Sequence, residues 1–204
     1  MANKLVLASR SPRRYELLKQ MGLVFDVVPS RIEEGGLLPG ESPGKHVLRL
    51  SEAKARDVGM QHPDAWVIGA DTIVFVDGTV LGKPKHREEA IEMLRQLSGK
   101  EHTVLSGFSV NHIGMGKRDQ EAVQTSVKVK SLTETEIKWY VGTGEPFDKA
   151  GAYAIQGIGS FMIDSIRGSY TNVVGLPVCE LIQMLNRLGA ITISESGIQI
   201  AGTE

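Results

Sequence analysis

The stretch LVLASRSPRRYELLKQM, residues 5–21, constrains the fold more than any other part of the chain. Its apolar run, residues 5–7, is typical of a buried strand. Ser11 and Pro12 match the N-cap and first position of a helix, since proline lacks only an N–H that the first turn leaves unpaired. Gly22 marks the end of this helix. The sequence therefore predicts a strand that passes at once into a helix.

The start of this helix carries Arg13 and Arg14, although a helix N-terminus is partially positive and disfavours cations by a few tenths of a kcal/mol. A bound anion would reverse that preference, because backbone N–H groups, the hydroxyls of Ser9 and Ser11 and the guanidinium groups would converge on it. One interpretation is a polyphosphate-binding site. The alternative is that both arginines are solvated or paired with neighbouring glutamates.

Composition limits the class of protein. The 204 residues are enough for one domain with a substantial core, and 23 Lys and Arg against 24 Asp and Glu argue against a nonspecific nucleic-acid or membrane binder. The single cysteine, Cys179, excludes an internal disulfide and is interpreted as a small core residue. No apolar run approaches the ~20 residues of a membrane span, and no signal-peptide pattern begins the sequence, so we expect a cytoplasmic protein.

Ser42 and Pro43 predict a second helix, which runs to about Val58. At about 100° per residue, Lys54 projects on the same side as Val47 and Val58. This lysine is therefore aimed at the interior or at a cleft, unless its stem covers apolar surface while its ammonium reaches water.

An acidic residue, Asp71, interrupts the otherwise apolar strand predicted over residues 66–76. Ionised carboxylates are rarely buried unless they are paired or bind a metal. Asp77-Gly78 predicts a two-residue hairpin, and its register places Lys83 opposite Thr72 and beside Asp71. A structural ion pair between Asp71 and Lys83 and a catalytic pair are both open.

The remaining pattern alternates helices and strands. Helices are predicted over residues 86–97 and 177–188, a short helix begins at a capping box of Thr133 and Glu136, and strands are predicted over residues 25–28, 102–113, 122–129 and 161–166. The polar loop 114–121 is interpreted as a turn, and the tail from Ile191 as a strand or a loosely held end. The glycine-rich segment 148–159 lets backbone approach a ligand, and Gln156 offers an amide there.

P-loop, dinucleotide-binding, HExxH and GxSxG motifs are absent from the sequence. The motifs that are present resemble those of the Maf family, the septum-formation-inhibitor-like nucleoside triphosphate pyrophosphatases. They are LVLASRSPRR at 5–14, Glu33-Glu34, SEAKA with Lys54, GADT at 69–72, GKP at 82–84, DKAGAYAIQG at 148–157 and GSYTNVVGLP at 168–177.

This resemblance implies a single domain over residues 1–204, of mixed α/β class, with a largely elongated central sheet flanked by helices and an active-site cleft between two lobes. It implies hydrolysis of a nucleoside triphosphate to the monophosphate and pyrophosphate with Mg²⁺ or Mn²⁺, in a homodimer that needs neither membrane nor nucleic acid. The implied catalytic residues are Asp71, Lys54 and Lys83, and the implied metal ligands are Glu34 and Asp71. Asp71 is open to two roles, general base or metal ligand. The implied substrate-binding residues are Ser9, Ser11, Arg13, Arg14, Thr72 and Gln156.

Arg13, Thr72 and Gln156 follow the dTTP/UTP branch of the family, which has a nucleotide-pool house-cleaning role linked to cell-division arrest. Thymine and uracil present an N3–H donor beside an O4 acceptor, which one primary amide satisfies. CTP and modified pyrimidine nucleotides are further candidate substrates. The alternatives are a pyrophosphatase for 7-methyl-GTP or other modified purines, and a binding regulator of septum formation without turnover.

Overall fold

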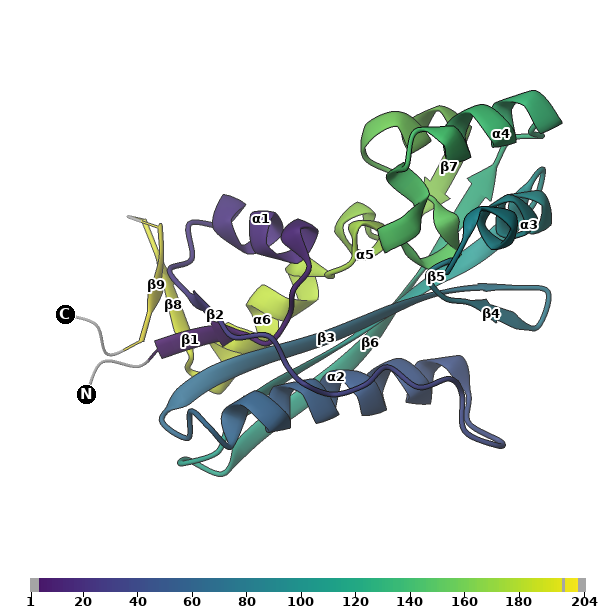
Figure 1. Cartoon of the computed structure of the whole chain (residues 1–204). Coiled ribbons are helices and arrows are strands. Elements are labelled where there is room, and N and C mark those ends of the chain that lie inside the picture. Colours follow the sequence, from purple (N-terminus) through teal and green to yellow (C-terminus); the bar gives the residue numbers. More distant parts are fainter. Residues whose placement is uncertain (1–3, 196, 202–204) are drawn as a thin grey trace. The chain divides into compact units, whose positions relative to one another are not determined.

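A computed structural model describes residues 4–195 and 197–201, and Figure 1 traces its elements. The strands are β1 (Lys4–Leu7), β2 (Asp26–Val27), β3 (Ala65–Val76), β4 (Thr79–Leu81), β5 (Glu101–His112), β6 (Lys117–Val129), β7 (Ile163–Arg167), β8 (Ile191–Ser194) and β9 (Gly197–Ile200). The α-helices are α1 (Pro12–Gln20), α2 (Pro43–Gly59), α3 (Arg87–Leu97), α4 (Glu134–Gly142), α5 (Tyr170–Val174) and α6 (Val178–Leu188), with 3₁₀ helices η1 (Glu145–Asp148), η2 (Ala150–Ala152) and η3 (Gly157–Met162). The predicted mixed α/β class, with a sheet flanked by helices, is confirmed.

The described residues form two compact units, and each is assembled from separate stretches of the chain. The first unit comprises residues up to Asp71, Ser106–Val123 and the residues from Gly175 onward. The second comprises Thr72–Leu105 and Gln124–Val174. Strands β3, β5 and β6 contribute residues to both units.

In the first unit β1 lies parallel to β2 on one side and to β3 on the other, with Val6 opposite Val67. Both helices of this unit that were predicted from serine–proline pairs begin where expected, with Ser11 and Ser42 as N-caps. The inner face of α2 packs on these strands through a core of Val6, Ala8, Ala55, Val58, Ala65 and Val67. This packing fixes the side of α2 that carries Lys54.

In the second unit the Asp77-Gly78 turn joins β3 to β4, and Val76 pairs with Thr79 as predicted. Both turn residues have positive φ, 48° and 79°, which is the conformation that this two-residue turn requires. The capping box of Thr133 and Glu136 starts α4, also as predicted. An apolar core lies around α3 and α4 and includes Val74, Leu94, Leu97, Val127, Ile137 and Tyr140.

Two local predictions need correction, and one helix was not predicted. Strand β6 begins at Lys117, so the loop 114–121 is largely strand and not only a turn. Helix α5 was not predicted. Of the two alternatives for the tail, the strand is confirmed, since β8 and β9 form an antiparallel hairpin. Cys179 is exposed, so its interpretation as a core residue was wrong: α6 turns Val178 and Leu181 inward instead. No helix in the described ranges is long and apolar enough to cross a bilayer.

Candidate active site

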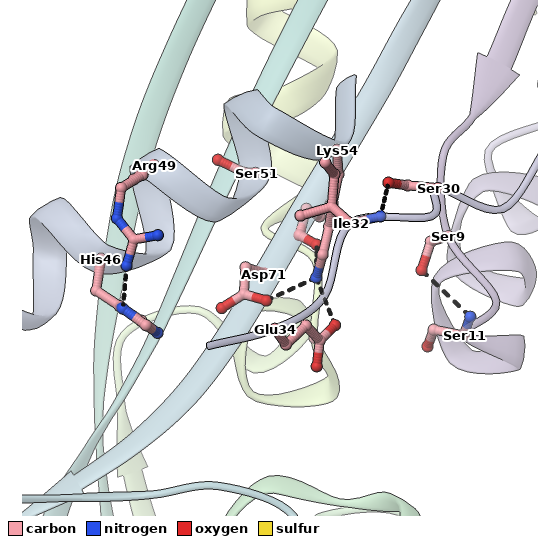
Figure 2. A network of polar contacts seen from close by, with 12 residues as sticks. Ser9, Ser11, Ser30, Ile32, Glu34, His46, Arg49, Ser51, Lys54 and Asp71 are labelled. Carbon is pink, nitrogen blue, oxygen red and sulfur yellow. Dashed lines mark hydrogen bonds and ion pairs between the residues drawn. The ribbon is translucent and has the colours of Figure 1, made fainter. Parts of the chain in front are cut away.

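The turn before α1 is organised by two serine hydroxyls. Ser9 Oγ accepts a hydrogen bond from the Ser11 backbone N–H at 3.2 Å, as Figure 2 shows. Ser11 Oγ in turn accepts from the Arg14 N–H at 3.4 Å and caps the helix. These bonds shape the start of α1, and a helix N-terminus is a place where anions bind.

Arg14 is buried, and its guanidinium links three segments of the first unit. Its Nε donates to the Gly175 carbonyl at 2.8 Å, and its Nη1 donates to the Ala70 carbonyl at 3.0 Å and to Ser9 Oγ at 3.2 Å. Burial lowers the pKa of Arg14 from its ordinary value, while Asp71 and Glu34 oppose that shift. Arg14 thus holds the start of α1 against the strand that carries Asp71, a role that the sequence did not predict.

Gly69 brings helix α2 unusually close to β3. A Cβ at this position would lie 2.2 Å from the Ser51 carbonyl oxygen and 2.6 Å from the Ala55 nitrogen. Only glycine permits this approach of two backbones. Because Lys54 lies between those two helical positions and Asp71 follows Gly69 by two residues, the contact sets their separation.

Lys54 joins the two acidic residues predicted as metal ligands. Its Nζ lies 2.7 Å from Asp71 Oδ1 and 2.5 Å from Glu34 Oε1 (Figure 2), and it also faces the Ala70 carbonyl at 3.4 Å. Both Lys54 and Asp71 are 5% exposed, whereas the Glu34 side chain is 48% exposed. The prediction that Lys54 points inward is therefore confirmed.

Asp71 and Lys83 belong to different units, so the proximity expected from the hairpin stays a prediction. The β3–β4 ladder ends at Val74 opposite Leu81, so Lys83 lies beyond the last pair and is exposed. The ion pair of Asp71 is with Lys54, from a helix that a strand register cannot reveal.

The segment that carries Glu34, residues 30–41, is called the strap here, and α2 side chains hold both of its ends. At one end Asp57 Oδ2 accepts from Ser30 Oγ at 3.1 Å and from the Arg31 N–H at 2.9 Å. At the other end Glu41 binds Arg49 through contacts of 2.6 and 2.9 Å. Residues 31–40 are exposed, so burial does little to hold this part of the strap. We infer that the anchors at its two ends keep Glu34 beside Lys54.

The second anchor includes a buried histidine. His46 Nδ1 lies 3.2 Å from Glu41 Oε2 and 3.1 Å from Arg49 Nη2, the latter contact drawn in Figure 2. The hydrogen bond from Arg49 is the largest of the effects that lower the pKa of Glu41 to about 2. Sequence analysis missed this anchor, since Glu41 precedes the helix and its spacing to Arg49 follows no helical period.

The oxygen donors suit a divalent cation. Within the described part of the chain no three His, Cys, Asp or Glu side chains cluster as a metal site. Glu34 and Asp71 nevertheless place two carboxylates around one position, which the Lys54 ammonium now neutralises. Mg²⁺ typically takes one or two protein carboxylates and completes its shell with water and substrate phosphate, so this pair fits it.

The other candidate residues belong to the second unit or lie near the surface. Thr72 is half-buried in β3, Lys83 is exposed after β4, and Gln156 is exposed at the start of η3. Arg13 is half-buried in the first turn of α1. The structure thus brings Ser9, Ser11, Arg14, Glu34, Lys54 and Asp71 together within the first unit.

Comparisons with known proteins match nearly the whole chain. A relative from Syntrophotalea carbinolica called dTTP/UTP pyrophosphatase is 52% identical over 195 residues, covering 94% of this chain and 88% of the relative. Proteins of the same name from Syntrophus aciditrophicus and Geotalea uraniireducens are 48% and 50% identical, covering 95% and 93% of this chain and 94% and 97% of their own lengths.

A solved structure described as a nucleoside-triphosphatase, or dITP/XTP pyrophosphatase, from Mycobacterium abscessus aligns over 91% of this chain and 95% of that chain. Its sequence identity is 16% and its TM-score is 0.45, a likeness too low to inform the site. The family model described as Maf-like protein matches residues 4–188, which include every candidate residue above. The chain therefore belongs to the Maf-like protein family.

Proposed function

We propose that this protein hydrolyses nucleoside triphosphates to the monophosphate and pyrophosphate, with dTTP and UTP as preferred substrates. The observation that carries the proposal is the buried ammonium of Lys54 held by Asp71 and Glu34, in the same unit as the start of α1. The relatives called dTTP/UTP pyrophosphatase, about half identical over nearly the whole chain, support the substrate.

Water attack at the α-phosphorus gathers negative charge on the non-bridging oxygens and on the leaving pyrophosphate, so catalysis is mainly positioning and charge neutralisation. We propose that the first turn of α1, with Ser9 and Ser11, binds phosphate oxygens. Arg13 and Lys83 supply further positive charge. Two nitrogens of Arg14 already bind protein oxygens, one of them Ser9 Oγ. We therefore propose that Arg14 contributes positive charge to the site and, through its bond to Ser9, fixes the shape of the turn.

We assign the divalent cation, Mg²⁺ or Mn²⁺, to Glu34 and Asp71. Such a cation neutralises phosphate charge and lowers the pKa of a bound water. With a cation there, the Lys54 ammonium would be available to the phosphates, and Asp71 would either ligate the cation or accept the proton of the attacking water. Both roles need an ionised carboxylate at this position.

We propose that Thr72 and Gln156 select the base. The Gln156 amide can accept from N3–H and donate to O4 of uracil or thymine at the same time. An unmatched buried polar group costs about 1–3 kcal/mol, which is enough to disfavour a purine edge by tenfold or more. CTP and modified pyrimidine nucleotides would be weaker substrates.

A nucleotide panel tests the proposal by pyrophosphate release with Mg²⁺ or Mn²⁺. We expect UTP and dTTP to be cleaved fastest, and Asp71→Asn to abolish turnover while nucleotide binding largely remains. Preference for 7-methyl-GTP or another modified purine would overturn the substrate assignment. Tight binding of UTP without pyrophosphate release would favour a regulator of septum formation over an enzyme.

The proposal also includes a cytoplasmic location, where nucleoside triphosphates are available, and a homodimer without membrane or nucleic-acid partners. Sedimentation of the purified chain measures the oligomeric state. A monomer that is fully active would refute the dimer as a requirement for turnover.

A further inference from the structure

The loop that carries Gln156, residues 154–159, is called the Gln156 loop here. Gln156 is exposed, and its side-chain amide hydrogen-bonds to nothing within residues 4–195 and 197–201. It also provides no side-chain cap for η3. The amide is therefore available to a ligand, and its position depends on the backbone to either side.

Glu145 binds the backbone of this loop on the C-terminal side of Gln156. Its Oε1 accepts from the Gly159 N–H at 2.9 Å, and its Oε2 accepts from the Ile158 N–H at 3.0 Å. Burial opposes ionisation of Glu145, but the hydrogen bonds from Gly159, Tyr140 and Ile158 together outweigh it and keep the pKa of this carboxyl below its ordinary value. An ionised carboxylate that accepts two backbone N–H groups is a strong, directional anchor.

Tyr140 binds the backbone of the same loop on the N-terminal side of Gln156. Its hydroxyl donates to Glu145 Oε1 at 2.9 Å and accepts from the Ala154 N–H at 3.3 Å. The tyrosine is fully buried, and burial is the largest effect that raises its pKa, so the hydroxyl keeps its proton at neutral pH. One tyrosine–glutamate pair thus ties down the backbone on both sides of Gln156.

The two glycines of the loop fit around this pair. A Cβ on Gly157, which has a φ of +70°, would lie 2.7 Å from Glu145 Oε2. A Cβ on Gly159 would lie 2.7 Å from the Tyr140 hydroxyl and 2.5 Å from the Ala154 carbonyl oxygen. The glycine-rich pattern after Gln156 therefore makes room for the carboxylate and hydroxyl that hold the loop.

We propose that Glu145, together with Tyr140, is a positioning residue for base selection, which fixes the backbone that presents the Gln156 amide. This inference rests on the proposed function. The amide must meet the base at one distance and direction to favour a matching edge, and a loosened loop loses that contact. The triphosphate is held elsewhere by charge, so loosening weakens recognition of the base without removing the reacting groups.

Steady-state kinetics of Glu145→Gln and Tyr140→Phe with UTP and CTP test the inference. The glutamine amide has one acceptor oxygen and one donor nitrogen, so it can accept from only one of the two backbone N–H groups. The phenylalanine removes the hydroxyl and keeps the packing of the ring. We expect KM for UTP to rise by roughly 5- to 30-fold, as for the loss of one or two neutral hydrogen bonds between the Gln156 amide and the base, with kcat changing by less than about threefold. The preference for UTP over CTP should shrink at the same time.

Glu134→Gln is the matched control, since Glu134 is an exposed carboxylate that pairs with Arg95 in the same unit. We expect it to keep the wild-type KM and base preference. Circular dichroism checks that each variant is folded, and Tyr140→Phe remains informative if Glu145→Gln unfolds. A folded variant with unchanged KM and preference, or with kcat reduced equally for UTP and CTP at unchanged KM, would overturn the inference. If the wild-type protein cleaves no pyrimidine triphosphate, the proposed function fails instead.

Discussion

Gly69→Ala tests the contact that brings Lys54 to Asp71. The added methyl would lie 2.2 Å from the Ser51 carbonyl oxygen, 2.6 Å from the Ala55 nitrogen and 2.9 Å from the Ala55 Cβ. Two of these three are backbone atoms, which cannot rotate away. Since carbon contacts relax to roughly 3.5 Å, helix α2 must move away from β3 by about 1 Å.

Overpacking of this kind costs about 1–3 kcal/mol, and for a chain of this length each kcal/mol lowers Tm by roughly 2–4 °C. We therefore expect Gly69→Ala to melt roughly 2–12 °C below wild type. A displacement of about 1 Å at reacting groups costs on the order of 100-fold in rate. Because Lys54 moves with α2, turnover of UTP should fall by about that factor.

Gly44→Ala is the matched control, because Gly44 lies in the first turn of the same helix and a Cβ there meets nothing within 4 Å. We expect it to be as stable as wild type or up to about 1 kcal/mol more stable, with unchanged turnover. Thermal unfolding by circular dichroism and pyrophosphate release at saturating UTP measure both effects. A Gly69→Ala protein with wild-type Tm and kcat would refute the argument from close packing.

Three further predictions concern buried charges. Lys54→Met leaves the Asp71 carboxylate buried without its partner, so the free energy of unfolding measured with urea should fall by about 3–5 kcal/mol. Adding Asp71→Asn to this variant should restore part of the stability but no turnover. Arg14→Lys should lose about 1–3 kcal/mol in the same assay, because one ammonium cannot replace the guanidinium between the Ala70 and Gly175 carbonyls; an unchanged midpoint would contradict this. Burial lowers the pKa of His102 from 6.5 to about 4, so as the pH falls the unfolded chain takes up this proton before the folded chain does. The free energy of unfolding should therefore fall between pH 6.5 and 4 by up to roughly 3 kcal/mol more in wild type than in His102→Gln.

Features set by neighbouring residues were predictable from the sequence. Ser11 and Ser42 cap helices whose first residue is proline, and the Asp77-Gly78 turn fixes the pairing of β3 with β4. In each case the hydrogen bonds or φ angles involve residues at most a few positions apart. The class of fold and the family followed from the order of such motifs.

The ion pair of Asp71 with Lys54 depends on tertiary packing, which a strand register does not reveal. The β3–β4 ladder ends at Val74, and Lys54 reaches Asp71 from helix α2. Gly69 was the available signal, since a glycine inside a buried strand often marks a close backbone approach. The burial of Arg14 carried no such signal, because its acceptors, including the Gly175 carbonyl, are main-chain atoms far along the sequence.

The first unit is assembled from three separate stretches of the chain, and this has a consequence during synthesis on the ribosome. Arg14 leaves the exit tunnel 161 residues ahead of Gly175, whose carbonyl accepts from its guanidinium. At about 5–20 residues per second, that guanidinium waits roughly 8–30 seconds for its acceptor. We expect the nascent first unit to remain open to chaperones and proteases over this interval, and to close only as the segment from Gly175 arrives.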